Sequence, residues 1–183
     1  LAKWVWSKIG EAVDPSNAGT WPTLSASQQE EMDVAITMLQ EAMELGHIPA
    51  ATVIGDMCFW GRGVAIDYPR AMAAYKIAAE AGDALSQHQL GMMYKLPGYG
   101  VAVDYQQARA WFEKAAAQDD PDAVGQLGQM YYAGHGVISS WRRARELWVS
   151  AIELGNPQSV THMQRLTQSI AAVTSSGKPP HAT

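Results

Sequence analysis

Hydrophobic and polar residues alternate along most of the chain with the period of an amphipathic helix. The first clear segment begins near Ser27, which has the spacing of a capping box with Glu30, and it ends at Gly46. Between these ends the apolar residues recur three or four positions apart: Met32, Ala35, Ile36, Leu39, Ala42 and Met43. The pattern predicts a helix that buries one face against its neighbours.

Six more segments of this kind follow, and they predict three pairs of helices. The first helices of the pairs are expected near Ile48–Phe59, Ala84–Lys95 and Pro121–Tyr132. The second helices are expected near Tyr68–Ala81, Tyr105–Ala117 and Trp141–Leu154. Asp67, Asp104 and Ser140 stand where each second helix begins, and their side chains are of the type that caps a helix N-terminus.

The three pairs repeat one another at a fixed spacing. The steps between corresponding landmarks are 36 and 37 residues, for Gly55, Gly91 and Gly128, for Gly63, Gly100 and Gly136, and for Ala71, Ala108 and Ala144. A one-residue insertion at Lys95–Gly98 accounts for the difference. Self-similarity of this period is the signature of a repeat protein, so the expected fold class is all-α. The helix before the pairs aligns with their second helices and is a half repeat.

The glycines in the middle of the first helices suggest close helix packing. A mid-helix glycine costs roughly 1 kcal/mol relative to alanine, so its recurrence needs a structural reason. We expect the ring of Tyr94 or Tyr131 to fill the space beside the glycine. Bulky Tyr75, Phe112 and Trp148 share one position in the second helices and are expected to fill the joint between repeats.

The chain divides into three regions. Residues 1–26 form an irregular N-terminal extension, residues 27–173 the repeat array, and residues 174–183 a flexible polar tail. Within the array, Pro157–Val173 begins like another first helix and then loses the landmarks. Terminal repeats are commonly atypical because one face meets solvent, so this segment is interpreted as a polar cap.

The N-terminal extension contains tryptophans at positions 4, 6 and 21. Trp4, Trp6 and Trp21 either pack on the first helix as a cap or dock onto a neighbouring protein, because tryptophan is enriched in binding hot spots. A membrane-surface helix is disfavoured, since one or two turns bury too little surface.

The repeated landmarks resemble the Sel1-like repeat, a relative of the tetratricopeptide repeat. The second pair carries the pattern through Leu90, Gly91, Tyr94, Gly98, Gly100, Val101, Asp104, Ala108, Phe112, Ala115 and Ala116. The resemblance covers roughly Met32 to Gln164, and Cys58 stands where the first pair would have the tyrosine.

The resemblance implies a right-handed α/α superhelix, a solenoid with about three full hairpin repeats and half repeats at both ends. It also implies a role as an adaptor or scaffold for protein complexes. Some secreted bacterial members of this family carry a cysteine pair in every repeat. This chain does not, which argues against that branch and its penicillin-binding activity.

Composition narrows the function classes further. The net charge of −5 gives no reason to expect nucleic acid as a partner, and the longest apolar runs fall short of the ~18 residues that cross a bilayer. The single cysteine, Cys58, excludes an internal disulfide and is expected to be a buried thiol. It favours an intracellular or organellar location. Because the chain starts at Leu1, we expect either a processed mature form or a trimmed form, in both of which any targeting peptide is already gone.

The sequence offers no motif for catalysis, a metal or a cofactor. The five histidines, His47, His88, His135, His162 and His181, lack the spacing of helix-borne metal ligands. The Gly-x-Gly loops lack the lysine and hydroxyl of a phosphate-binding loop, and chain reversal accounts for them. Asp119, Asp120 and Asp122 are interpreted as an acidic helix start. The basic cluster Trp141–Arg145 is interpreted as a solvated helix face.

Binding of a partner peptide or protein is the favoured function. Stacked hairpins form a concave surface lined by the first helices, and equivalent positions there hold Asp56, Phe59, Met92, Lys95, Gln129 and Tyr132. The alternative for Phe59 and Tyr132 is that they pack inside the hairpin. A second hypothesis is a permanently bound structural subunit of a larger complex, anchored by its tryptophan-rich N-terminus. A hydrolase-like enzyme is the third hypothesis.

Overall fold

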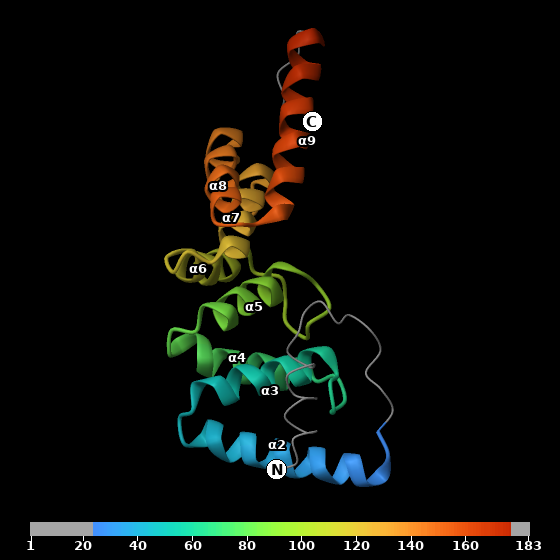
Figure 1. Cartoon of the computed structure of the whole chain (residues 1–183). Coiled ribbons are helices and arrows are strands. Elements are labelled where there is room, and N and C mark those ends of the chain that lie inside the picture. The colour runs from blue at the N-terminus through green and yellow to red at the C-terminus, as the bar shows by residue number, and fades with distance from the viewer. Residues whose placement is uncertain (1–23, 177–183) are drawn as a thin grey trace. The chain divides into compact units, whose positions relative to one another are not determined.

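The computed structural model describes residues 24–176, with side chains described as far as Ala171. All regular structure in this part of the chain is helical, as the sequence predicts (Figure 1). The helices are α2 (Ala26–Glu44), α3 (Ile48–Trp60), α4 (Tyr68–Glu80), α5 (Ala84–Lys95), α6 (Tyr105–Ala116), α7 (Pro121–Ala133), α8 (Trp141–Glu153) and α9 (Pro157–Ser176). Their ends differ from the predicted ones by at most three residues, and α9 continues past residue 173 into the predicted tail.

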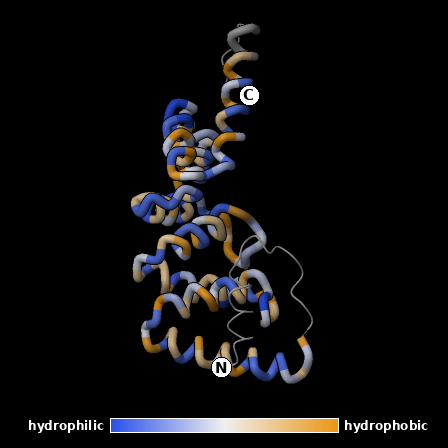
Figure 2. The backbone as a smooth tube through the Cα atoms, viewed as in Figure 1, coloured by the Kyte–Doolittle hydropathy of each residue, from blue (hydrophilic) through white to orange (hydrophobic). Residues whose placement is uncertain are grey.

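The helices fall into two compact units, and each unit is built from neighbours in the sequence. In the first unit, whose described residues are 24–103, α2 packs on α3, α3 on α4, and α4 on α5. In the second unit, whose described residues are 104–176, α6 packs on α7, α7 on α8, and α8 on α9. Apolar and polar residues alternate along each helix, so each helix has an apolar side to bury (Figure 2).

Side chains cap the helices where the sequence predicts it. Asp67, Asp104 and Ser140 each accept a hydrogen bond from a backbone N–H in the first turn of α4, α6 and α8. The capping box predicted for α2 is wrong in its residues, because the observed one uses Ser25 and Gln28 instead of Ser27 and Glu30. Ser27 lies inside the helix.

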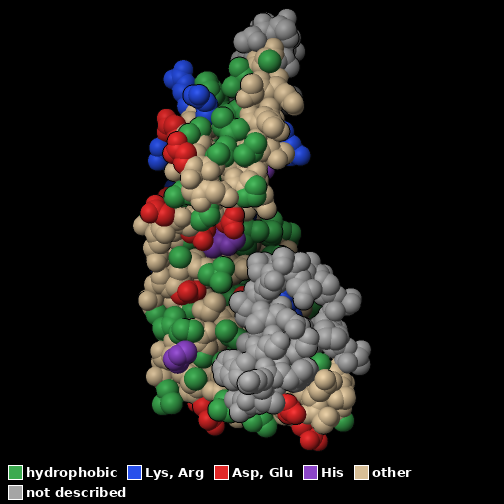
Figure 3. All heavy atoms as spheres, viewed as in Figure 1, with side chains coloured by type: hydrophobic (Ala, Val, Ile, Leu, Met, Phe, Trp, Pro, Cys, Tyr) green, Lys and Arg blue, Asp and Glu red, His purple; other side chains and the backbone are tan. Residues whose placement is uncertain are grey.

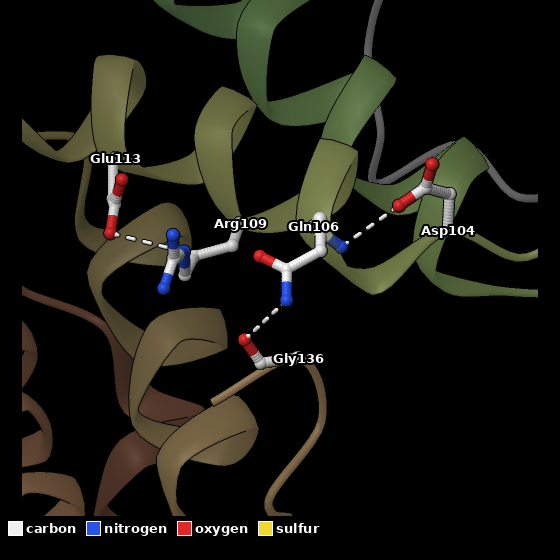
Figure 4. A network of polar contacts seen from close by, with 5 residues as sticks. All are labelled: Asp104, Gln106, Arg109, Glu113 and Gly136. Carbon is white, nitrogen blue, oxygen red and sulfur yellow. Dashed lines mark hydrogen bonds and ion pairs between the residues drawn. The ribbon is translucent and has the colours of Figure 1, made fainter. Parts of the chain in front are cut away.

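The Gly-x-Gly loops of the two hairpins that lie within one unit reverse the chain between paired helices, as expected. Gly61 and Gly134 end α3 and α7 in the left-handed conformation, with φ of 67° and 75°, which glycine adopts at little cost. In the second unit the loop is tied to α6: the Gln106 side chain donates to the carbonyl oxygen of Gly136 at 3.0 Å (Figure 4). Figure 4 also shows Asp104 accepting from the Gln106 backbone N–H.

Gly55 and Gly128, in the middle of α3 and α7, each accept an aromatic ring from the second helix of the same hairpin. A Cβ atom on Gly55 would lie 2.5 Å from the ring of Tyr75, and one on Gly128 would lie 2.5 Å from Nε1 of Trp148. The expectation that the ring of Tyr131 fills this space is therefore wrong. The ring comes from twenty residues farther along the chain.

Small residues let the second helices lie close to their neighbours. In α4 the side chains of Ala71, Ala74 and Ala78 are buried together with Tyr75. Cys58 is buried as expected, and this burial raises the pKa of its thiol. In the second unit Ala144, Trp148 and Leu166 form a core cluster, against which Tyr131, Trp141, Met163 and Ile170 pack.

Replacing Gly128 with alanine tests the ring contact. Gly128→Ala should lower the free energy of unfolding by about 1–3 kcal/mol, because the added methyl group overlaps the Trp148 indole. Helix propensity alone predicts the opposite sign, since alanine is favoured by about 1 kcal/mol. Urea denaturation followed by circular dichroism measures the difference. In a Trp148→Leu background the same substitution should become neutral or stabilising. Wild-type stability of Gly128→Ala would contradict the contact.

Candidate functional site

Asp56 on α3 is a buried carboxylate that serves packing within the first unit. Its side chain is 4% exposed, and Oδ1 accepts a hydrogen bond of 2.6 Å from the hydroxyl of Tyr75. Burial raises the pKa of Asp56, and the Tyr75 hydrogen bond and the Arg62 charge oppose this shift. Burial, followed by the nearby Asp56 charge, raises the pKa of Tyr75. Asp56 thus offers no surface to a partner.

Phe59, one turn farther along α3, is also inside the unit. It is 7% exposed. Its ring centroid lies 5.5 Å from that of Tyr68, 5.1 Å from that of Tyr99 and 4.8 Å from that of Trp60. Of the two alternatives for Phe59, packing is the one observed. Asp56 and Phe59, which the sequence suggested as contact residues, are therefore packing residues within the first unit.

Met92 and Lys95 on α5 are half-buried. Burial lowers the pKa of the Lys95 ammonium to about 8, because the charged form loses hydration. The N-terminal tryptophans Trp4, Trp6 and Trp21 lie outside the described residues.

Gln129 and Tyr132 on α7 come together with two side chains of α9 in the second unit. They line a hollow of about 290 Å³ with His162 and Arg165. Nε2 of Gln129 lies 2.6 Å from Nε2 of His162, so a polar contact joins the two helices. Tyr132 is 37% exposed, and Arg165 is exposed as well.

Trp148 provides the apolar floor of this hollow. Its ring centroid lies 5.6 Å from that of Tyr132 and 5.2 Å from that of His162, whose ring is stacked on it. Leu166 completes the floor and is buried. We call the surface formed by Gln129, Tyr132, His162, Arg165 and Trp148 the α7/α9 groove. It combines an apolar base with a polar rim, as protein interfaces do.

His162 and Arg165 were not among the predicted site residues, because the sequence of their segment indicates a polar cap. The repeat spacing contains the signal that finds them. Arg165 lies 36 residues after Gln129, and His162 lies 36 residues after Gln126, so both occupy first-helix positions of the next repeat. The groove therefore continues onto α9.

The acidic residues at the start of α7 belong to its N-terminal cap and first turn, in agreement with the sequence-based interpretation. Asp120 is the N-cap and accepts from the backbone N–H of Ala123 at 2.6 Å. Residues 24–171 contain no group of three or more His, Cys, Asp or Glu side chains that could hold a metal ion. Over the same part of the chain, none of the helices has both the length and the apolar character to span a membrane.

The Sel1 repeat sequence profile matches residues 48–83, 84–120 and 121–156, which is well over half of the chain. The chain belongs to the Sel1 repeat family. Proteins of this family generally mediate protein–protein interactions. The three matched segments are the three predicted helix pairs, and α2 and α9 flank them as half repeats.

Solved structures share the fold. A Sel1 repeat protein from Oxalobacter formigenes is 28% identical, with a TM-score of 0.63, over 72% of this chain and 98% of its own. The protective antigen c5321 of uropathogenic Escherichia coli, which has an SLR fold, is also 28% identical, with a TM-score of 0.65, over 85% of this chain and 35% of its own. Helicobacter pylori cysteine-rich protein B shares the fold at 22% identity and a TM-score of 0.54, over 69% of this chain and 95% of its own.

A curated relative is the ERAD-associated E3 ubiquitin-protein ligase component HRD3B of Arabidopsis thaliana. It is 32% identical over 94 residues, which are 51% of this chain and 15% of the relative. The chain thus matches only a small part of the length of this relative.

The buried carboxylate of Asp56 should make stability depend on pH. Its pKa in the folded state lies above the unfolded value of about 3.9, so the unfolded state releases its proton first as pH rises. The contribution of Asp56 to stability therefore falls from about pH 4 up to its raised pKa. Asp56→Asn keeps an oxygen acceptor for Tyr75 and should remove this fall. Urea midpoints from pH 3.5 to 8 measure it, and an unchanged profile would contradict the assignment.

Lys95 should make stability rise with pH in the alkaline range, which is the opposite of the effect of Asp56. Its folded pKa of about 8 lies below the unfolded value of about 10.4, so the unfolded state binds more protons between these values. Stability should therefore rise from pH 8 to pH 10, and Lys95→Met should flatten this rise and stabilise the protein at pH 7. The exposed Lys76→Met variant is the control. An ammonium resonance of Lys95 that titrates near pH 10 would refute the shift.

Proposed function

We propose that this protein is a non-catalytic scaffold that binds a partner polypeptide in the α7/α9 groove. The observation that carries the proposal is the convergence of Tyr132 and Arg165, both exposed, over the apolar floor of Trp148. A large rigid ring and an arginine are the side chains most often found at binding hot spots. The family's general role in protein–protein interaction supports the same conclusion.

The lining of the groove indicates the chemistry of the partner. Arg165 supplies a cation, Gln129 and Tyr132 supply polar groups, and none of the residues that line the groove is acidic. Arginine binds carboxylates through paired hydrogen bonds. The preferred ligand is therefore a segment with an aspartate or glutamate next to an apolar side chain, which packs on Trp148 and Leu166.

Membership of a larger assembly is part of this proposal. The name of HRD3B describes it as a component of an E3 ubiquitin-protein ligase, and its matching part offers a precedent for such repeats inside a complex. An adaptor of this kind needs its groove exposed when the partner is absent. A permanent subunit anchored by Trp4, Trp6 and Trp21 is the second possibility from the sequence.

Peptide selection against the full chain tests the groove. Random 12-residue peptides displayed on phage should enrich for an acidic residue beside an apolar one. Binding of a synthetic selected peptide, measured by fluorescence anisotropy, should weaken tenfold or more with Tyr132→Ala and with Arg165→Gln. Loss of one hot-spot side chain corresponds to about 1.4 kcal/mol or more.

Arg143→Gln is the matched control for charge. Arg143 lies on the exposed side of α8, where it pairs with Glu146 at 2.8 Å, and it does not line the groove. Its substitution should leave peptide binding unchanged. Circular dichroism of each variant shows whether the fold is kept. Equal peptide affinities for all three folded variants would place the binding surface elsewhere.

A further inference from the structure

The helix α9 begins as the first helix of another repeat. The Asn156 side chain accepts from the backbone N–H of Ser159 at 2.7 Å. The Asp83 side chain accepts from the backbone N–H of Ser86 at 2.8 Å in the same way, where α5 begins. Ser86 and Ser159 are both fully buried. α9 therefore enters its unit in the register of a first helix.

Among the described residues, no helix covers the face of α9 that corresponds to the α8-facing side of α7. On α7, Gly128 lies under the Trp148 ring, and Tyr131 packs against Ala144 and Trp148 of α8. The positions 36 residues later on α9 are Gln164 and Thr167. With Ile152, Val160, Met163 and Gln168, these two residues line an open, mostly apolar hollow of about 390 Å³.

The burial of the equivalent positions shows the difference directly. Gly128 is buried, whereas Gln164 is exposed, and Val160, one turn before it, is 41% exposed. Along the described side chains of α8 and α9, Val149 and Leu154 are each 38% exposed as well. We call the surface lined by Ile152, Val160, Met163, Gln164, Thr167 and Gln168 the α9 seat.

The charge pattern of α9 is that of an interface. Its sequence contains one arginine, Arg165, which belongs to the groove, and no acidic residue or lysine. By contrast, α8 carries Arg142, Arg143, Arg145, Glu146 and Glu153, and Figure 3 shows blue side chains gathered over it. Depletion of charge is typical of the core of a protein interface, whereas solvated helix faces are charged.

We propose that the α9 seat binds an amphipathic helix of a partner protein, which lies on α9 as α8 lies on α7. The fold itself supplies the template, because a helix covers the equivalent face on α7. This surface is distinct from the α7/α9 groove, and the proposal goes beyond the function proposed above. Docking of an amphipathic helix on an apolar groove is a common mode of peptide recognition.

Two side chains specify which helix fits. Gln164 stands where α7 has Gly128, so the docked helix must present an aliphatic residue where α8 presents Trp148. Arg145 lies at helical spacing before Val149 and Ile152, on the edge of α8 that adjoins the seat. An acidic residue on the docked helix is expected to face Arg145.

One segment of this chain can serve as a test peptide for binding to the α9 seat. The segment 25–45 has the register of a second helix, with Leu39 where the other second helices have an aromatic residue. It is strongly acidic, with Glu30, Glu31, Asp33, Glu41 and Glu44 and no lysine or arginine, and red side chains lie over α2 in Figure 3. At 21 residues, a synthetic peptide of this segment is long enough to form a helix on binding.

Titration of this peptide into the ¹⁵N-labelled full chain tests the proposal by NMR. Amide shifts should change at Val160, Gln164 and Thr167, and the dissociation constant should rise at least tenfold in Val160→Asp. Gln158→Asp, at an exposed position on the side of α9 opposite Val160 and outside the seat, should have no effect. A Leu39→Trp peptide should bind wild type more weakly and regain affinity for Gln164→Gly.

Three results would overturn the proposal. The first is the absence of shift changes on α9 at millimolar peptide. The second is a set of changes on α3 instead, which would mean that the peptide displaces α2. The third is that the same α9 amides shift with protein concentration in the absence of peptide, which would show that a second copy of the chain occupies the seat.

Discussion

An aromatic ring laid on a helical glycine holds together each hairpin that lies within one unit. In the first unit Tyr75 lies on Gly55, and in the second Trp148 lies on Gly128. Glycine costs about 1 kcal/mol in a helix, and burial of the ring and the closer helix approach offset this cost. The contact fixes the distance between the two helices of the hairpin, and this distance determines which side chains remain exposed on the outer surface.

The repeat, the helices and most caps could be predicted because their signals are local. Asp67, Asp104 and Ser140 cap their helices through backbone groups two or three residues away. The ring contact was assigned to the wrong tyrosine because it joins positions twenty residues apart, and sequence spacing cannot rank such partners. For α2, Ser25 and Ser27 are both suitable capping residues, and the oxygen that reaches a free N–H decides between them.

Only part of the candidate site could be predicted from the sequence, because equivalent positions in the repeats differ in burial. Asp56 and Gln129 correspond, but the hydroxyl of Tyr75 donates to Asp56 and holds it inside the unit. Trp148 has no hydroxyl, and its Nε1 donates to the carbonyl oxygen of Gly125 instead. Gln129 can therefore reach across to His162. The difference between tyrosine and tryptophan at this position of the second helix thus changes which side chains of the first helix are exposed to a ligand.

The Trp148 side chain has two structural roles. It packs on Gly128, and it forms the floor of the α7/α9 groove between Tyr132 and His162. Under the proposed function, ligand binding in the α7/α9 groove and folding of this hairpin are therefore thermodynamically linked. A ligand that seats on the indole adds its binding free energy to the cohesion of α7 with α8. Melting temperature becomes a readout of occupancy, and chemical libraries can be screened by heat alone before any partner has been named.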